Sequence, residues 1–538
     1  AGNTSFRKRA ALSKNFTLYA DYKKNFNDRH DLSVMVGTSH ESENYDRFTA
    51  KRINFDQQEN MSLQLGSAQD QNAWSEGNQW TINSFFSRVN YTFANKYVIE
   101  GTIRADGSSR FDPDHRWGWF PGVNAAWRVG EEGFMKRLGW FEDLKVRASY
   151  GEMGNQSGIG LYDYIQLISL SNDYYPFGAG MKGQMATSGN IISTSRTWET
   201  IQTTNVGFDF STLNNRLYGS FDYFWKENKN MLIPKTYPSM LGADAPSTNS
   251  GHLSIHGWEI SLGWRDQIKD FSYSVRFNIS DAKNKVVDRV GSNLIKLGNN
   301  ETPTGYPLNS YFGYEFDGII QNEQELEAYK SRFSEGGIPG DLSVGDAMYK
   351  DLDGDGKLSV LGDGKEGSGD VKYLGDKNPR YNFGFNLSMA WKGFDLSAFI
   401  QGVGRRTMFL EGESRCPMPE AWYQSAEYWY GKTWTPERTD AQYPAITLKD
   451  KRNYNYYVST NTKFNVAYAR LKNLQFGYTI PQTLTSKAGL QKVRVYFSGE
   501  DLFEVHNTPN GWDPEENSGS ITSYPFTRNY SFGINVVF

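Results

Sequence analysis

The sequence predicts an all-β protein, a transmembrane antiparallel β-barrel with long extracellular loops and short periplasmic turns. Three observations predict it: apolar and polar residues alternate in many segments, brief and long connections alternate along the chain, and aromatic residues make up 15% of it. Membrane barrels alternate lipid-facing and lumen-facing residues along each strand, and they carry aromatic girdles at both bilayer surfaces. We count about fifteen such segments, most near the ~10 residues that a tilted strand needs.

The alternation is clearest at the end of the chain. Its apolar face consists of Tyr530, Phe532, Ile534, Val536 and Phe538, with mostly small or polar residues between them. A strand that closes on an aromatic residue is typical of the last strand of an outer-membrane barrel, and we expect it to be the signal for the barrel assembly machinery. The same period of two recurs in residues 89–93, 97–103, 144–150, 217–225, 258–264 and 271–279.

The connections between these segments orient the barrel. Brief connections are expected at residues 25–31, 94–96, 130–143, 213–216, 266–270, 392–393 and 481–491. Long ones are expected at 41–83, 105–116, 152–202, 231–255, 288–379, 405–462 and 504–527. Short periplasmic turns and long external loops give this order in membrane barrels. A soluble β-sandwich, the alternative fold, has no reason to keep its long loops at one end.

Composition excludes several other classes of protein. The mean hydropathy is −0.64, and no run approaches the ~18 apolar residues of a membrane helix. A net charge of −4 and a pI of about 6.0 give no sign of nucleic-acid binding. The single cysteine, Cys416, excludes a disulfide framework within the chain. We find no Ser-His-Asp, Walker or dinucleotide motif, so we expect no enzymatic activity.

Two groups of residues fit the two faces of a barrel wall. The girdle candidates at turn ends are Tyr91, Phe93, Tyr97, Trp391 and Phe394, for which ordinary cross-strand pairing is the alternative. The candidates for the polar inner face are Arg88, Arg104, Lys145, Arg147, Arg276 and Asn278. For each of these, a solvated barrel face is a simpler explanation than direct contact with a substrate.

An acidic segment resembles the first half of a calcium loop. Asp351, Asp353 and Asp355 stand at positions 1, 3 and 5 before Gly356, and Lys357 supplies a main-chain carbonyl. Position 12 is a glycine where an acid is expected, so the candidate metal site would be closed by Asp363, or by Glu366 or Asp370. The alternative is an acidic turn ordered without metal. In either case the segment would stiffen an external loop.

A second loop segment is rich in aromatic residues: Trp422, Tyr423, Tyr428, Trp429, Tyr430 and Trp434. Flat rings in a wet loop can stack on sugar faces or anchor a protein partner, because they bring a large contact area at low entropic cost. The alternative is that the rings pack inside a folded external loop.

Several motifs resemble those of one transporter family. The most specific block is residues 104–111 (RADGSSRF), followed by 116–121 (RWGWFP), 126–128 (AWR), 132–135 (EGFM) and 144–151 (LKVRASYG). Segments 223–232, 249–259, 351–356 and 499–503 and the closing strand continue the likeness. In this order they are similar to the barrel signature of SusC/RagA-type TonB-dependent transporters.

The resemblance implies more than the residues themselves. It implies a barrel of about 22 strands with a plugged lumen. Residues 1–538 would be the carboxy-terminal portion of this barrel. The plug domain, a TonB-contacting segment and a signal peptide would lie upstream. It also implies an outer-membrane location and TonB-driven import of large nutrients, oligosaccharides first and oligopeptides next. A SusD-like surface lipoprotein would cover the loops. The alternative functions are a passive porin and a barrel-anchored binding protein or adhesin.

Overall fold

The computed structural model describes residues 3–55, 62–69, 71–176, 182–188, 191–234, 240, 246–289, 298–301, 303–360, 369–419, 424–447, 451–516, 524 and 526–538. The chain divides into two compact units whose boundaries cut across strands. The first unit holds residues 1–128, 147–205 and 226–253, and the second holds 129–146, 206–225 and 254–538.

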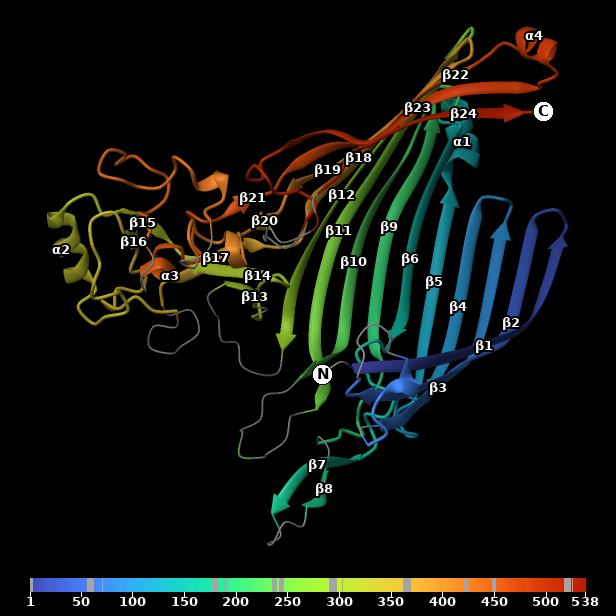
Figure 1. Ribbon diagram of the computed structural model, residues 1–538. Helices are drawn as coiled ribbons and strands as arrows, with labels where there is room; N and C mark the ends of the chain where they lie inside the picture. Colours follow the sequence, from blue (N-terminus) through green and yellow to red (C-terminus); the bar gives the residue numbers. More distant parts are fainter. Residues whose placement is uncertain are drawn as a thin grey trace. The chain divides into compact units, whose positions relative to one another are not determined.

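Fifteen strands form one sheet in chain order, and each characterised neighbouring pair is antiparallel (Figure 1), which confirms the predicted fold class and strand number. The strands are β1 (Asn3–Phe26), β2 (His30–Ile53), β3 (Gln71–Phe93), β4 (Tyr97–Ser108), β5 (Trp117–Arg128), β6 (Asp143–Asn155), β9 (Glu199–Thr212), β10 (Leu217–Pro234), β11 (Ser247–Ile268), β12 (Phe271–Arg289), β18 (Arg380–Trp391), β19 (Phe394–Arg405), β22 (Tyr468–Thr479), β23 (Lys492–His506) and β24 (Asn529–Val537). Within the described ranges, no helix has the length and apolar character that crossing a membrane requires.

The brief connections are tight because their residues accept left-handed backbone. Trp391 pairs with Phe394, so Lys392 and Gly393 form a two-residue turn, and their φ angles are 46° and 90°. Positive φ at both central positions gives the turn whose twist matches that of the flanking strands. The two modest connections at this end each carry one short helix, α1 (Gly133–Leu138) and α4 (Gln482–Thr485).

Two expected long loops are shorter than the sequence predicts. The connection expected at 41–83 covers only residues 54–70, because β2 and β3 stay paired in continuous register from His30↔Phe93 to Arg52↔Gln71. The connection expected at 231–255 likewise shrinks to 235–246. The ends of β2 and β11 that extend into these connections, residues 41–53 and 247–252, are mostly polar, so they lack the apolar alternation by which a strand is recognised. The connection expected at 152–202 holds its own hairpin, β7 (Ile168–Pro176) and β8 (Lys182–Ser188).

One face of β3, β4 and β5 exposes large apolar side chains. Ile99 is 56% exposed, and rows of aromatic rings lie on the same face toward both ends of the strands. The row at the short-turn end stacks Phe93 on Tyr97 and Tyr97 on Trp127, and the other row stacks Phe85 on Trp117. Pairing of rings across strands is therefore present, and the two rows are compatible with the predicted girdles. A patch of this kind marks a surface that water does not cover, which favours a bilayer-facing wall over a soluble sandwich.

The opposite face of the same strands is polar and internally paired. The Glu100 carboxylate accepts hydrogen bonds from Arg88 Nε at 2.6 Å, from Asn90 Nδ2 at 3.1 Å and from Asn124 Nδ2 at 3.2 Å, which links all three strands. Arg104 donates to Asp106 and to Ser84 on the neighbouring strand. The polar face expected for a barrel lumen is therefore a cross-strand network, in which each charge has a partner.

The long connections of the second unit fold into a body with its own secondary structure (Figure 1). We call the described residues within 298–376, 405–467 and 507–516 the external body. Its elements are β13 (Gly298–Glu301), β14 (Ser310–Tyr314), β15 (Phe316–Ile319), α2 (Glu323–Arg332), β16 (Ala347–Tyr349), β17 (Val371–Asp376), β20 (Thr407–Met408), α3 (Lys451–Asn455) and β21 (Phe464–Asn465). Asn322 is the N-cap residue of helix α2, and its side chain accepts from the Glu325 amide at 2.9 Å.

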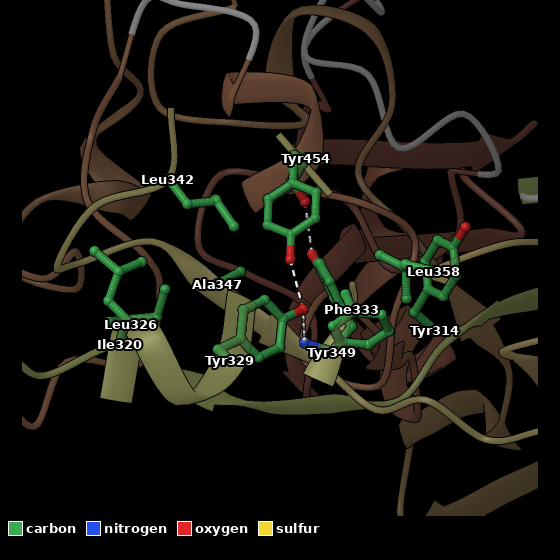
Figure 2. Close-up of a cluster of buried hydrophobic side chains, with 10 residues drawn as sticks. All are labelled: Tyr314, Ile320, Leu326, Tyr329, Phe333, Leu342, Ala347, Tyr349, Leu358 and Tyr454. Carbon is green, nitrogen blue, oxygen red and sulfur yellow. Dashed lines mark hydrogen bonds between the residues drawn. The ribbon is translucent and has the colours of Figure 1, made fainter. Parts of the chain in front are cut away.

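Three buried tyrosines hold the external body together (Figure 2). The Tyr329 hydroxyl lies 2.6 Å from the Tyr454 hydroxyl and accepts from the Tyr349 amide at 2.9 Å. The Tyr349 hydroxyl donates to the Tyr454 carbonyl at 2.7 Å. Burial raises the pKa of Tyr329 to about 12, so the network stays neutral at physiological pH. Tyr454 belongs to a different long connection from the other two, and the cluster therefore joins two loops into one core.

We expect the Tyr329→Phe substitution to loosen this core. It leaves the buried amide of Tyr349 without its acceptor, which costs about 1–3 kcal/mol. Hydrogen exchange followed by mass spectrometry should show faster exchange at residues 347–350 and no change in the strands of the sheet. The matched control is Tyr430→Phe, because the Tyr430 side chain is 89% exposed. Equal exchange rates in the two variants would contradict the role of the tyrosine cluster.

Candidate functional site

Three carboxylates meet in the external body at the predicted calcium segment. Oxygen atoms of Asp351, Asp353 and Asp370 all lie within 4.8 Å of one another. Asp370 is fully buried, and that burial, with the charges of the other two carboxylates, raises its pKa. Like charges held this close repel, and a bound cation would relieve the repulsion. The donor set, all hard carboxylate oxygens, fits Ca²⁺.

The same oxygens also order the backbone around them. Asp351 accepts from the amides of Gly354 at 2.7 Å and Gly356 at 3.0 Å, and Gly356 has the positive φ, 75°, that the turn requires. Asp370 accepts from two amides, both at 2.8 Å or less. A carboxylate oxygen has two lone pairs, so these bonds are compatible with a cation as well as with a turn ordered without metal.

The other predicted calcium ligands that the structure describes do not join the group of three carboxylates. Asp355 accepts from the Lys357 amide at 2.8 Å and is not part of the three-carboxylate group. Lys357 pairs with Gly336 in an isolated bridge. Asp363 lies outside the described residues. Asp370, which the sequence offered only as one of several closing acids, is the group that completes the cluster.

The aromatic segment forms the centre of a second core. Trp429 is 3% exposed and packs edge-on against Tyr443 at 4.9 Å and Tyr456 at 5.5 Å between ring centroids. Tyr428 lies between the two sides of this core: its hydroxyl is 2.6 Å from that of Tyr443, and its ring is 5.9 Å from Trp512. Rings predicted as contact residues thus join residues 406–467 to residues 507–516.

The remaining members of the aromatic segment differ in exposure. Trp434 is half-buried and its indole donates to Gln321 at 3.0 Å, which ties this segment to the connection that carries α2. Tyr430 is 89% exposed, so among the described members it is the ring best placed for a partner or a substrate. Trp422 and Tyr423 lie outside the described residues.

The end of the chain forms strand β24, as predicted. It pairs with β23 in continuous register, and Phe532 lies against Phe497 with ring centroids 5.3 Å apart. Tyr530, Phe532 and Ile534 are exposed, as is Phe538 at 82%, while Val536 is 40% exposed. β24 is the edge strand of the sheet and all of its residues except Gly533 are exposed, and its alternate apolar side chains are those that a bilayer would cover.

Sequence reasoning missed a buried charge network at the base of the external body. Arg470 of β22 is 1% exposed and forms ion pairs with Glu504 of β23 at 3.2 Å, Asp513 at 2.7 Å and Glu515 at 3.2 Å. The network fastens the connection between β23 and β24 to the wall. The alternation of β22 places Arg470 on the polar face. Its ion pairs could not be predicted from the sequence, because the partner carboxylates lie up to 45 residues later in the chain.

Comparisons with known proteins agree with this geometry. Residues 1–502 match the family model described as "TonB dependent receptor-like, beta-barrel". The chain is 31% identical to TonB-dependent receptor P3 of Formosa agariphila, over 100% of this chain and 53% of that protein, and 26% identical to TonB-dependent receptor SusC of Bacteroides thetaiotaomicron, over 97% and 50%. It spans about half the length of these curated relatives.

A solved structure shows the same fold. The structure of the RagAB peptide transporter aligns with a TM-score of 0.81 and 23% identity over 99% of this chain and 56% of that one. These likenesses agree with the family match over most of the chain and with the fifteen-stranded sheet, which exposes an apolar face. The chain belongs to the TonB-dependent receptor β-barrel family, as a SusC/RagA-type member of the outer membrane.

Proposed function

We propose that this chain is the barrel portion of a transporter that takes up large nutrients through the outer membrane, driven by TonB. The observation that carries the proposal is the family match over residues 1–502 on a sheet with an apolar and a polar face. The relatives are named as receptors, which fits a protein without enzymatic activity. We propose oligosaccharides as the first substrate class and oligopeptides as the second.

A surface lipoprotein of the SusD type is the proposed partner. The external body supports this part of the proposal, because its two hydrophobic cores make it a folded surface rather than a set of separate loops. A folded surface can hold a protein lid without a large loss of loop entropy on binding. Tyr430, with its exposed ring, is a candidate contact residue on this surface.

Two alternatives make different predictions. A passive porin would let solutes through without an energy source, and its loops would fold into the channel. A barrel-anchored adhesin would bind its ligand and not transport it. The external body, which buries its own core, favours a binding surface over a simple channel constriction.

Uptake by the native strain distinguishes these possibilities. We expect uptake of labelled oligomers to fall to background when either the gene for this protein or the gene for TonB is deleted, because the import is energised. The assay follows parallel sets of oligosaccharides and oligopeptides of matched length, and mass spectrometry of the gently purified complex identifies a bound lipoprotein.

Other outcomes separate the alternatives. Uptake that continues without TonB would identify a porin, and binding without uptake would identify an adhesin. A small monosaccharide that crosses by general porins is the control, and its uptake should not depend on this protein.

We also propose that Asp351, Asp353 and Asp370 hold a calcium ion that stiffens the external body. The support is the convergence of their oxygens and the hard-oxygen chemistry of the group. On this proposal the main-chain bonds of Asp351 and Asp370 preorganise the turn, and the ion would remove the repulsion among the three carboxylates.

Calcium should therefore slow hydrogen exchange in residues 351–360 of the full-length protein. The double substitution Asp351→Asn and Asp353→Asn removes two charges, and it should raise the calcium concentration needed for half-maximal protection by at least roughly tenfold, since affinity follows ligand charge. Asp341→Asn, at an exposed carboxylate of the same connection, is the matched control. Exchange that is the same with calcium and with a chelator would mean that the turn is ordered without metal.

The proposed assembly signal can be tested at the last residue. We expect Phe538→Ser to lower the amount of folded protein in the outer membrane several-fold, because the apolar face of β24 would lose its terminal ring. The measurement is a heat-modifiability gel on purified outer membranes. Val537→Ser, one residue earlier on the other face, is the control, and equal levels for both variants would rule out a special role for Phe538.

A further inference from the structure

A positively charged pocket opens where three strands leave the sheet for the long connections. Its volume is about 400 Å³, and its lining includes Lys283 and Lys285 of β12, Arg405 at the end of β19, and Asp376 at the end of β17. In a barrel of this family the long-connection end faces the outside of the cell. The pocket therefore lies on the side from which a nutrient arrives.

Most other charges around the pocket already have partners. Arg380 forms a bidentate pair with Asp281, whose side chain is 6% exposed. Asp376 accepts from the Tyr373 hydroxyl at 2.8 Å and from the Asn378 amide at 3.0 Å. Nearby, Glu315 accepts hydrogen bonds from Lys350 and from Lys372, and these contacts lower the pKa of Glu315 to about 2. These groups are engaged in holding the fold.

Three cations on the pocket wall are left for a ligand. In the part of the chain that the structure describes, no carboxylate lies within ion-pair distance of Lys283, Lys285 or Arg405, and all three are exposed. Burial, and after it the charges of Arg405 and Lys372, lower the pKa of Lys463. A concave site with an excess of positive charge over negative charge concentrates anions.

The arrangement of the three cations suits an anionic group on an oligomer. Lys283 and Lys285 are two residues apart on one strand, so their Cα atoms are about 7 Å apart and their side chains lie on the same face. The guanidinium of Arg405 presents a planar fork that matches a carboxylate or a sulfate, and the ammonium groups add adaptable point charges. Neutral sugar hydroxyls would gain little from three unpaired cations.

We propose that this pocket binds the carboxylate or sulfate groups of the imported oligomer, so that the substrate of the transporter is anionic. This inference rests on the proposed import function and narrows its substrate class. The pocket would act as an early recognition site at the external mouth, raising the local concentration of acidic oligomers and discriminating against neutral ones.

The test uses the full-length protein in detergent with its native partner. Binding is measured by calorimetry at low and high salt for three probes: an oligogalacturonate hexamer, its fully methyl-esterified form, and a hexaglutamate peptide. The triple substitution K283Q/K285Q/R405Q is compared with a matched control, R137Q/K269Q/K487Q, which removes three exposed cations from short connections. Heat-modifiability gels verify that both variants are folded.

We expect the wild-type protein and the control to prefer an acidic probe to the ester. The triple variant should bind that probe at least about tenfold more weakly, with a shallower dependence on salt. The acidic probe that binds better identifies the carrier as glycan or peptide. Equal binding of acid and ester, failure of both acidic probes to bind, or unchanged binding by the triple variant would overturn the proposal.

A lipid source of the anion is tested separately. If the triple substitution weakens binding of lipid A phosphates but leaves the acidic hexamers unaffected, the pocket is a lipid site and the proposal fails. Failure of the proposed import function can be distinguished from failure of the pocket proposal. In that case uptake would be independent of TonB, whichever charge the pocket prefers. Conversely, TonB-dependent uptake of neutral oligomers that the triple substitution leaves unchanged would overturn only the pocket assignment.

Discussion

The whole structure depends on the requirement that main-chain N–H and C=O groups be paired wherever the chain is surrounded by lipid. An unpaired group in hydrocarbon costs several kcal/mol, so strands can cross only in an unbroken antiparallel ladder. The register of β1 with β2 shows this continuity, running without a break from Asn3↔Ile53 to Phe26↔His30. Once the ladder is fixed, the pleat alone sends successive side chains to opposite faces, and a lipid-facing and a polar wall follow.

The same ladder explains how the protein carries a folded body at one end. Strands β12 and β18, which flank the longest connection, stay paired from Phe271↔Trp391 to Ser280↔Asn382, so this connection starts from a rigid edge. From there a connection of about ninety residues is too long to remain without structure of its own. It buries Tyr329 and Tyr349 against Tyr454 of the next long connection, and the aromatic segment around Trp429 brings in the last one. Each connection supplies part of a core that none could form alone.

Charge then divides the long-connection end into paired and unpaired regions. Arg470 and Arg380 are deeply or partly buried, and each has carboxylate partners that make removal of one side costly. They fasten the external body and the strand ends. Lys283, Lys285 and Arg405 line the same pocket as Arg380 but form no ion pair among the described residues. The cations that form ion pairs stabilise the fold, and the three that form none are available to bind an anionic ligand.

The sequence by itself determined the antiparallel sheet, the number of strands and the alternation of the closing strand. All of these follow from period-two alternation and from connection length, which are local properties that each crossing strand must satisfy on its own. Only the tertiary structure decided that residues 41–53 continue a strand, because a polar strand outside the bilayer leaves no alternation to read. It also decided that Trp429 is buried, that Asp370 joins Asp351 and Asp353, and which cations find partners. These outcomes depend on packing between connections far apart in the chain, and burial and ion pairing are set by that packing.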